Sequence, residues 1–276
     1  MNSEDWRLGR RPGLDGLRGV AILLVVAAHL GVRSLEFLGG IGVTVFFTLS
    51  GFLITALLLD EHDLAGRISM RRFYKRRFFR LAPAFLLMLA IVVPLEFAVS
   101  GSAPYWWTTI AEVSNWVSAT KGPAPLDLLH HTWSLAIEEQ FYLAWPVVLW
   151  GLSQRFGRRA VIASGAVGIG LSLTTALAAH GYRLAFGTDT NASSLLAGCL
   201  LAAMMVGRNV RVAPGWTMAV SLGLALISWR FVEQPILRRF SHRVEVRVRP
   251  GVSELGGVER SPRHVDGTRL QDVSRA

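Results

Sequence analysis

The amino-acid sequence predicts an all-α fold, a polytopic transmembrane bundle of about seven helices. Apolar residues make up 51% of the 276 residues, whereas charged residues make up only 17%. The apolar residues fall in blocks near the roughly 20 residues that a helix needs to cross a bilayer core of about 30 Å. Clusters of arginine separate these blocks, as the positive-inside rule requires of a membrane protein.

Each apolar block is predicted to be a helix, because backbone groups inside a bilayer must bond to one another. The blocks are 17–33, 40–59, 81–99, 139–152, 160–179, 192–207 and 214–230. The block 139–152 is short and needs its flanks to span. The tryptophan-rich segment 105–118 either lies on the membrane surface or dips into it, and both interpretations stay open.

The charges between the blocks predict the topology. Arginine clusters at 71–80, 155–159 and 208–211 favour the cytoplasmic side, and the N-terminus is expected there too, before an uncleaved anchor helix. The last block, 214–230, then runs outward and places the arginines after it outside, against the rule. Either this block does not span, or an odd number of helices is missing before it. We expect a membrane domain at 1–240 and a disordered polar tail at 241–276.

Composition also excludes several classes of function. The net charge of +10 comes largely from arginines beside the blocks, so no nucleic acid is expected as a partner. The single cysteine, Cys199, excludes an internal disulfide and a cysteine-rich metal site. No cluster has the spacing of metal ligands, so no metal is predicted. The expected partner is the membrane lipid bilayer.

Arg18 and His29 are the candidates for chemistry in the first block. They are eleven residues apart, so both lie on one face of a helix, separated by about 16 Å. An ionisable side chain inside a membrane helix is expensive and is a functional hypothesis by default. The alternative is a histidine satisfied by a partner helix, with Arg18 as an anchor at the interface. The pattern alone does not choose between the two.

A basic segment, 71–80, precedes the third block and includes Arg76, Arg77 and Arg80. One interpretation is control of topology together with binding of anionic lipid headgroups. The other is a cytoplasmic clamp for a phosphate-bearing molecule, because arginine binds phosphate through a forked pair of donors.

Other polar and small residues have structural explanations. Glu138 and Glu139 stand at a helix start, where the helix dipole favours carboxylates. Asp189 and Thr190 are candidate N-caps. The pair Ser50-Gly51 is interpreted as a small-residue packing site, and the glycines at 165, 168 and 170 as helix packing rather than a dinucleotide loop.

Five motifs occur in order over about 210 residues. They are Leu14–Gly19 with the spacing from Arg18 to His29, Phe46–Ile54, Arg77–Pro83, Thr132–Leu135 with Glu138 and Phe141-Tyr142, and Gly187–Thr190. Together they resemble the acyltransferase-3 family of bacterial inner-membrane O-acyltransferases. No single motif is decisive, but the five in this order are specific.

The resemblance implies an enzyme that moves an acyl group, commonly acetyl, from cytoplasmic acetyl-CoA or another acyl-CoA to a hydroxyl. The acceptor is implied to be a cell-surface glycan or a lipid-linked sugar, and the location the bacterial inner membrane. His29 and Arg18 match the family's active-site pair, and Arg77 and Arg80 match its cytoplasmic R-x-x-R motif, beside Arg76. His29 is expected to act as general base, or to carry the acyl group briefly.

The remaining candidate residues are expected toward the outer side. Glu138 is expected to polarise the histidine or to bind the acceptor. Asp189, Trp133 and Ser134 are expected on the acceptor side, away from the cytoplasmic entrance.

The sequence departs from the family near its C-terminal end. The resemblance implies about ten membrane helices, and about three are expected to be missing between about 208 and 214, which agrees with the charge pattern. The alternative to an active enzyme is therefore a shortened, non-catalytic member, either a degenerate copy or a binding subunit. A transporter of acyl groups or glycans is a third hypothesis.

Overall fold

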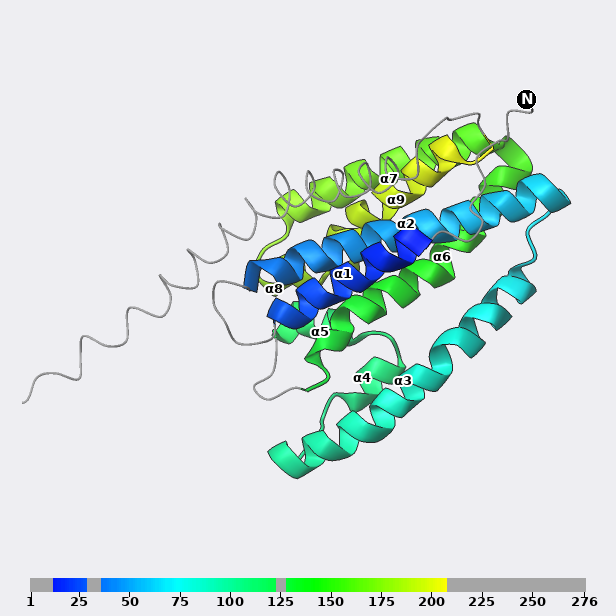
Figure 1. Cartoon of the computed structure of the whole chain (residues 1–276). Helices are drawn as coiled ribbons and strands as arrows, with labels where there is room; N and C mark the ends of the chain where they lie inside the picture. Colours follow the sequence, from blue (N-terminus) through cyan, green and yellow to red (C-terminus); the bar gives the residue numbers. More distant parts are fainter. Residues whose placement is uncertain (1–11, 29–35, 123–127, 208–276) are drawn as a thin grey trace, which may run out of the picture. The chain divides into compact units, whose positions relative to one another are not determined.

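The computed structural model describes residues 12–28, 36–122 and 128–207, all within the unit Met1–Phe240. These residues form helices and no strand, which confirms the predicted all-α class for this part of the chain (Figure 1). The long helices are α1 (Pro12–Ala28), α2 (Glu36–Ala65), α3 (Met70–Ser100), α6 (Trp133–Phe156), α7 (Arg158–Ala178) and α9 (Thr188–Met205). The short ones are α4 (Trp106–Ile110), α5 (Ser114–Lys121), the 3-10 turn η2 (His130–Thr132) and α8 (Tyr182–Phe186).

Six of the seven predicted blocks lie on the long helices. Helix α6 extends beyond the short block 139–152 at both ends, because it has 24 residues and is about 36 Å long. Among the described helices, α2, α3 and α7 are long and apolar enough to cross a membrane. The block 214–230, the gap expected near 208–214 and the tail 241–276 lie outside the described residues and stay predictions.

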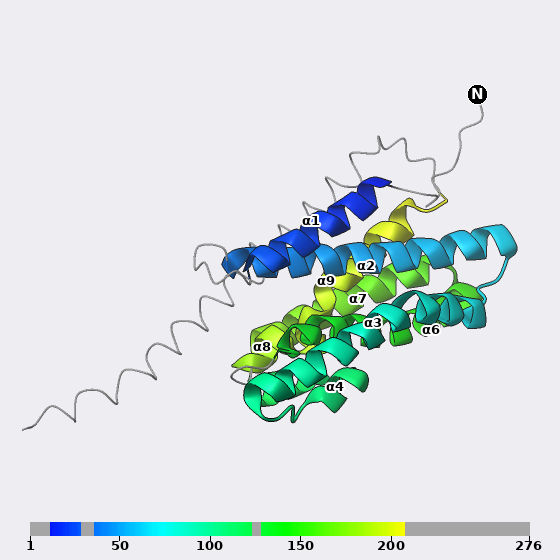
Figure 2. The same cartoon turned by 60° about the horizontal axis from the view of Figure 1, so that its bottom comes forward.

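Helix α2 packs against α1, α6 and α9 (Figures 1 and 2). Two glycines set its distance from α9. A Cβ atom at Gly51 would lie 1.9 Å from the carbonyl oxygen of Leu195, and one at Gly198 would lie 1.9 Å from the carbonyl oxygen of Thr48. Because small residues let helix backbones approach closely in a membrane, the predicted packing role is confirmed for Gly51.

Helix α7 packs against α9 as well. A Cβ atom at Gly168 would lie 2.7 Å from the side chain of Leu196, and one at Gly165 would lie 3.9 Å from that of Leu200. A Cβ atom at Gly170 would have no neighbour within 4 Å. The predicted packing therefore holds for two of the three glycines, and Gly170 faces open space.

Helix α3 lies at the edge of the helical group (Figure 1). Only 11% of its most apolar stretch is buried, against 72% in α2. Polar contacts in its first turns connect it to α6. The Tyr74 hydroxyl donates to the Leu143 carbonyl oxygen at 2.9 Å, and Arg77 pairs with Glu139 at 3.0 Å.

The short helix α5 contacts α4, α6 and α8 (Figure 1). Neither α4 nor α5 is long enough to cross a bilayer. The Gln140 amide donates to Asn115 Oδ1 at 2.9 Å, and the Thr188 hydroxyl donates to Gln140 Oε1 at 2.6 Å. The Asn115 amide donates to Thr188 Oγ1 at 2.9 Å. This three-residue network holds the starts of α5 and α9 against α6.

Candidate active site

A cavity of about 710 Å³ lies among helices α1, α2, α3 and α6. Its volume is in the range of small-molecule sites, about 300–1,000 Å³. The cavity is lined by Arg18 and Ile22 of α1; Phe46, Leu57, Asp60 and Glu61 of α2; Arg72, Phe73, Arg76, Arg77, Arg80 and Leu81 of α3; and Leu135, Glu138, Glu139 and Tyr142 of α6. We call it the arginine cavity, because five of these side chains are arginines.

Helix α3 supplies four of the five arginines. Arg72, Arg76 and Arg80 follow one another at intervals of four residues, so they lie on one side of the helix, within about 80° of arc. Guanidinium groups on one helix face offer several forked donors to the same ligand. This wall of the cavity is suited to the oxygens of phosphate groups.

A chain of hydrogen bonds crosses from α1 to α6 at the cavity. Arg18 Nη2 donates to the Ser50 hydroxyl oxygen at 3.3 Å. The hydroxyl groups of Ser50 and Tyr142 both donate to the same carboxylate oxygen, Glu138 Oε1. Ser50, Glu138 and Tyr142 are only 1%, 4% and 2% exposed. A buried carboxylate must be compensated in this way, because an uncompensated charge is strongly destabilising.

Arg77 of α3 contacts two residues of α6, Tyr142 and Glu139. Its guanidinium carbon lies 3.0 Å from the centre of the Tyr142 ring, and its Nη2 donates to Glu139 Oε1 at 3.0 Å. The Nε atoms of Arg18 and Arg77 are buried without a hydrogen-bond partner among the described residues. Both side chains line the arginine cavity, so their guanidinium groups can meet a ligand there.

Five of the residues predicted from the sequence line this one cavity: Arg18, Glu138, Arg76, Arg77 and Arg80. They come from three helices that lie up to 120 residues apart in the chain. His29 lies outside the described residues, so its place relative to this cavity stays a prediction.

The three residues predicted on the acceptor side do not line the arginine cavity. Trp133 packs edge-on against Phe186 of α8, with ring centres 5.2 Å apart, and the Ser134 hydroxyl donates to the carbonyl oxygen of His131 at 3.4 Å. Asp189 forms an ion pair with Arg183 at 2.7 Å. Glu138 lines the arginine cavity and these three residues do not, although Ser134 lies only one helical turn before Glu138 on α6.

The expected N-cap of α9 is wrong. The helix begins at Thr188 and Gly187 occupies the N-cap position, without a side-chain capping bond. Asp189 and Thr190 lie within the first turn instead. The Thr190 hydroxyl donates to the carbonyl oxygen of Gly187 at 2.9 Å.

The sequence predictions do not include two residues of this hydrogen-bond chain, Ser50 and Tyr142. The sequence predicts Ser50 and Gly51 as a packing pair, but the two have different neighbours: Gly51 meets α9 and Ser50 meets Arg18 and Glu138. Tyr142 was given no role. Its position four residues after Glu138 was a usable signal, because residues at that interval are neighbours on a helix.

A second, largely apolar groove of about 680 Å³ runs between α3 and α6 and shares Arg77, Glu139 and Tyr142 with the arginine cavity. Glu112 also lines it and has an unusual backbone conformation for a residue other than glycine, with φ of 53°. Burial, and secondly the charge of Glu139, raises the pKa of the Glu112 carboxyl to about 7.

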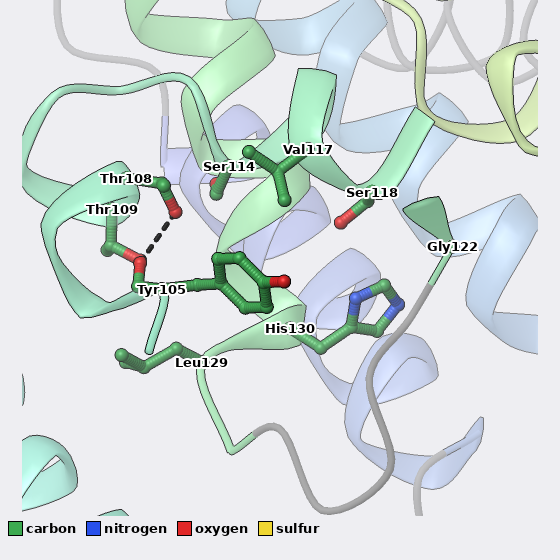
Figure 3. Close-up of a pocket in the computed structure, with 9 residues that line it drawn as sticks. All are labelled: Tyr105, Thr108, Thr109, Ser114, Val117, Ser118, Gly122, Leu129 and His130. Carbon is green, nitrogen blue, oxygen red and sulfur yellow. Dashed lines mark hydrogen bonds between the residues drawn. The ribbon is translucent and has the colours of Figure 1, made fainter. Parts of the chain in front are cut away.

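A third cavity lies beside α4 and α5 (Figure 3). Tyr105, Ser114, Ser118 and His130 are among the residues that line it. Its volume of about 20 Å³ suffices for roughly one water molecule. It is too small for an acyl donor or a sugar. Among the described residues no cluster of His, Cys, Asp and Glu could hold a metal ion.

Comparisons with known proteins match most of the chain. Residues 11–237 match the model of a family described as an acyltransferase domain. The O-acetyltransferase OatA of Staphylococcus aureus (strain NCTC 8325 / PS 47) is 37% identical over 207 residues, covering 69% of this chain and 34% of that protein. The putative O-acetyltransferase SACOL0978 of S. aureus (strain COL) is 35% identical over 215 residues, with the same coverage. The chain therefore spans about a third of the length of these curated relatives. No solved structure matches the chain.

Proposed function

The chain belongs to the acyltransferase-3 family, whose model matches residues 11–237, and on this premise we propose that it is a membrane-embedded O-acyltransferase. Its donor is a cytoplasmic acyl-CoA, most simply acetyl-CoA, and its acceptor is a hydroxyl of a cell-surface glycan or a lipid-linked sugar. The location is the bacterial inner membrane, with the N-terminus in the cytoplasm. The names of both relatives, as O-acetyltransferases, support the choice of an acetyl group and an oxygen acceptor.

The observation that carries this proposal is the arginine cavity. It combines a row of arginines on α3 with the buried hydrogen bond from Ser50 to the Glu138 carboxylate. Ser50 is midway along the 30-residue helix α2. The arginines suit the phosphates of a CoA donor, because each guanidinium offers a forked pair of donors. The pantetheine arm then extends from α3 past Arg18 toward His29, so that the thioester lies inside the helical group.

In the reaction, the acceptor hydroxyl oxygen attacks the thioester carbonyl carbon. The new C–O bond forms, the C–S bond breaks, and CoA leaves as its thiol with the proton taken from the hydroxyl. His29 serves as the base that accepts this proton and returns it to the sulfur. Because eleven residues of predicted helix separate Arg18 from His29 by about 16 Å, Arg18 is assigned to the pantetheine arm of the donor and not to the reacting carbonyl.

The acceptor enters from the opposite end, near α8 and the start of α9. Trp133, Ser134 and Asp189 are candidates to hold it, because aromatic and carboxylate side chains suit a sugar with many hydroxyl groups. None of the three lines the arginine cavity, which is compatible with a donor and an acceptor that approach from different sides of the membrane.

The test is acyl transfer by the purified protein in lipid nanodiscs. We expect release of CoA thiol from acetyl-CoA and formation of an acetyl ester on a glycan acceptor. His29→Ala should abolish both, while His180→Ala, which alters an exposed histidine of the described chain, should change neither. Normal transfer by His29→Ala would refute the assignment of the base.

The same experiment distinguishes the non-catalytic alternative. A binding subunit or degenerate copy would bind acetyl-CoA in equilibrium dialysis without releasing thiol. A protein that neither binds acyl-CoA nor turns it over would overturn the proposed donor.

A further inference from the structure

Arg18 and Glu138 carry opposite charges at the arginine cavity and are connected through one small side chain. Ser50 Oγ accepts a hydrogen bond from Arg18 Nη2 at 3.3 Å and donates its own proton to Glu138 Oε1. The three residues come from α1, α2 and α6. A hydroxyl is suited to this position, because it can accept from a cation and donate to an anion at the same time.

We propose that Ser50 is a positioning residue that fixes Arg18 relative to Glu138. This proposal rests on the function proposed above, since the orientation of Arg18 matters only if Arg18 meets the acyl donor. Ser50 is 1% exposed, so it does not itself touch a ligand in the cavity. It acts through Arg18, whose Nη2 is held by Ser50 and whose side chain lines the arginine cavity.

The neighbouring contacts hold the Glu138 carboxylate in place. Tyr142 donates to the same oxygen of Glu138, and the Arg77 guanidinium lies over the Tyr142 ring at 3.0 Å. Glu138 is therefore held by two hydroxyl groups from different helices. Arg18 lies on α1 and is connected to the Glu138 carboxylate through Ser50.

The same helix pair offers a matched control. Five residues after Ser50, the Trp145 indole N–H of α6 donates to the Thr55 hydroxyl oxygen of α2 at 2.8 Å. Thr55 and Trp145 are also buried, at 0% and 5% exposed. This bond joins α2 to α6 but does not line the arginine cavity. Thr55→Val therefore removes a buried bond of the same interface without touching Arg18.

The experiment measures thiol release from acetyl-CoA for Ser50→Ala, Thr55→Val and the wild type in nanodiscs. We expect Ser50→Ala to lower kcat by about 10- to 100-fold, because it removes a hydrogen bond to a charged group at both ends. KM for acetyl-CoA should change by less than about threefold, since the arginines of α3 remain. Thr55→Val should retain kcat within about twofold. Equal loss of kcat in the two variants would overturn the proposal.

A second measurement does not depend on turnover. The effects of Arg18→Ala and Glu138→Gln on thermal unfolding should be non-additive in the wild type and additive in the Ser50→Ala background. Additive effects in both backgrounds would overturn the positioning role. A wild type that does not turn over acyl-CoA would refute the proposed function, while the unfolding measurement would still decide the role of Ser50.

Discussion

Helices α2 and α3 have equal mean hydropathy in their most apolar stretches, yet 72% of that stretch is buried in α2 and 11% in α3. Helix α2 contains Gly39, Gly40, Gly42 and Gly51, whereas α3 contains no glycine. In a bilayer, apolar side chains gain little by choosing a helix over lipid, and small residues decide which helices approach. Hydropathy therefore identifies the segments that enter the membrane, and small residues identify those that pack there.

The two helices also contribute differently to the site. Helix α2 is held by backbone approach to α9 and supplies Ser50 from a rigid, buried position. Helix α3 is joined to α6 through polar side chains, Tyr74 and Arg77, and supplies the arginines. Substitutions where α2 packs against α9 should therefore act mainly on stability, and those in the first turns of α3 mainly on ligand binding.

The largest effect is expected at Gly51. A methyl group there would overlap the carbonyl oxygen of Leu195, so α2 and α9 would have to separate. We expect Gly51→Ala to destabilise the protein by about 3 kcal/mol or more. Thermal unfolding in detergent would measure this loss. Gly170→Ala is the matched control, because a Cβ atom there has no neighbour within 4 Å. Unfolding of Gly51→Ala at the wild-type temperature would break the comparison.

The next effect concerns equal truncations in the two helices. Leu49 of α2 is 0% exposed and Leu87 of α3 is 63% exposed. Leu49→Ala should lower the free energy of unfolding by about 2–5 kcal/mol through lost packing. Leu87→Ala should change it by less than about 0.5 kcal/mol. If both substitutions have the same effect under denaturation in nanodiscs, the Leu87 face of α3 has a packing partner.

The third effect is a difference in acetyl-CoA binding between substitutions of two α3 arginines, Arg77 and Arg71. Arg77 lines the cavity and pairs with Glu139, whereas Arg71 is exposed and does not line the cavity. Arg77→Ala should weaken binding of acetyl-CoA by about 10- to 100-fold in equilibrium dialysis, because it removes charged hydrogen bonds. Arg71→Ala should bind within about twofold of the wild type. Equal losses would favour a general role of the basic segment in membrane topology or lipid binding.

The smallest effect is a pH dependence in the groove beside α3. The pKa of Glu112 is about 7 in the folded chain against a reference value of 4.5, so folding favours its neutral form. Its contribution to stability is fully present below pH 4.5 and is lost as the pH rises through about 7. The melting temperature of the wild type should therefore fall over this range. Glu112→Gln should flatten that part of the pH profile, and an unchanged slope would exclude Glu112 as its source.

Much of the fold could be predicted from the sequence. The apolar blocks marked the long helices that the structure describes, because the need to satisfy backbone groups in a bilayer leaves few alternatives. Helix ends were less predictable: α9 begins at Thr188 rather than after an Asp189 or Thr190 cap. The network among Gln140, Asn115 and Thr188 fixes that start, and it joins residues far apart in the chain.

The site was predictable in part. The family motifs contain Arg18, Glu138, Arg77 and Arg80, and in the structure these four residues line one cavity. The role of Ser50 was hidden, because a serine beside a glycine in an apolar helix is ordinarily a packing residue. The base expected at His29 stays a prediction, since that residue lies outside the described part of the chain.

The helical class, the segments apolar enough for a membrane and the row of arginines follow from the amino-acid sequence, because hydropathy and helical spacing are local properties. The tertiary structure alone decided that Ser50 meets Glu138, 88 residues away, while its neighbour Gly51 meets α9. It also decided that α2 is buried and α3 exposed despite their equal hydropathy. The reason is physical: lipid competes with apolar side chains on equal terms, so packing depends on how closely two backbones fit.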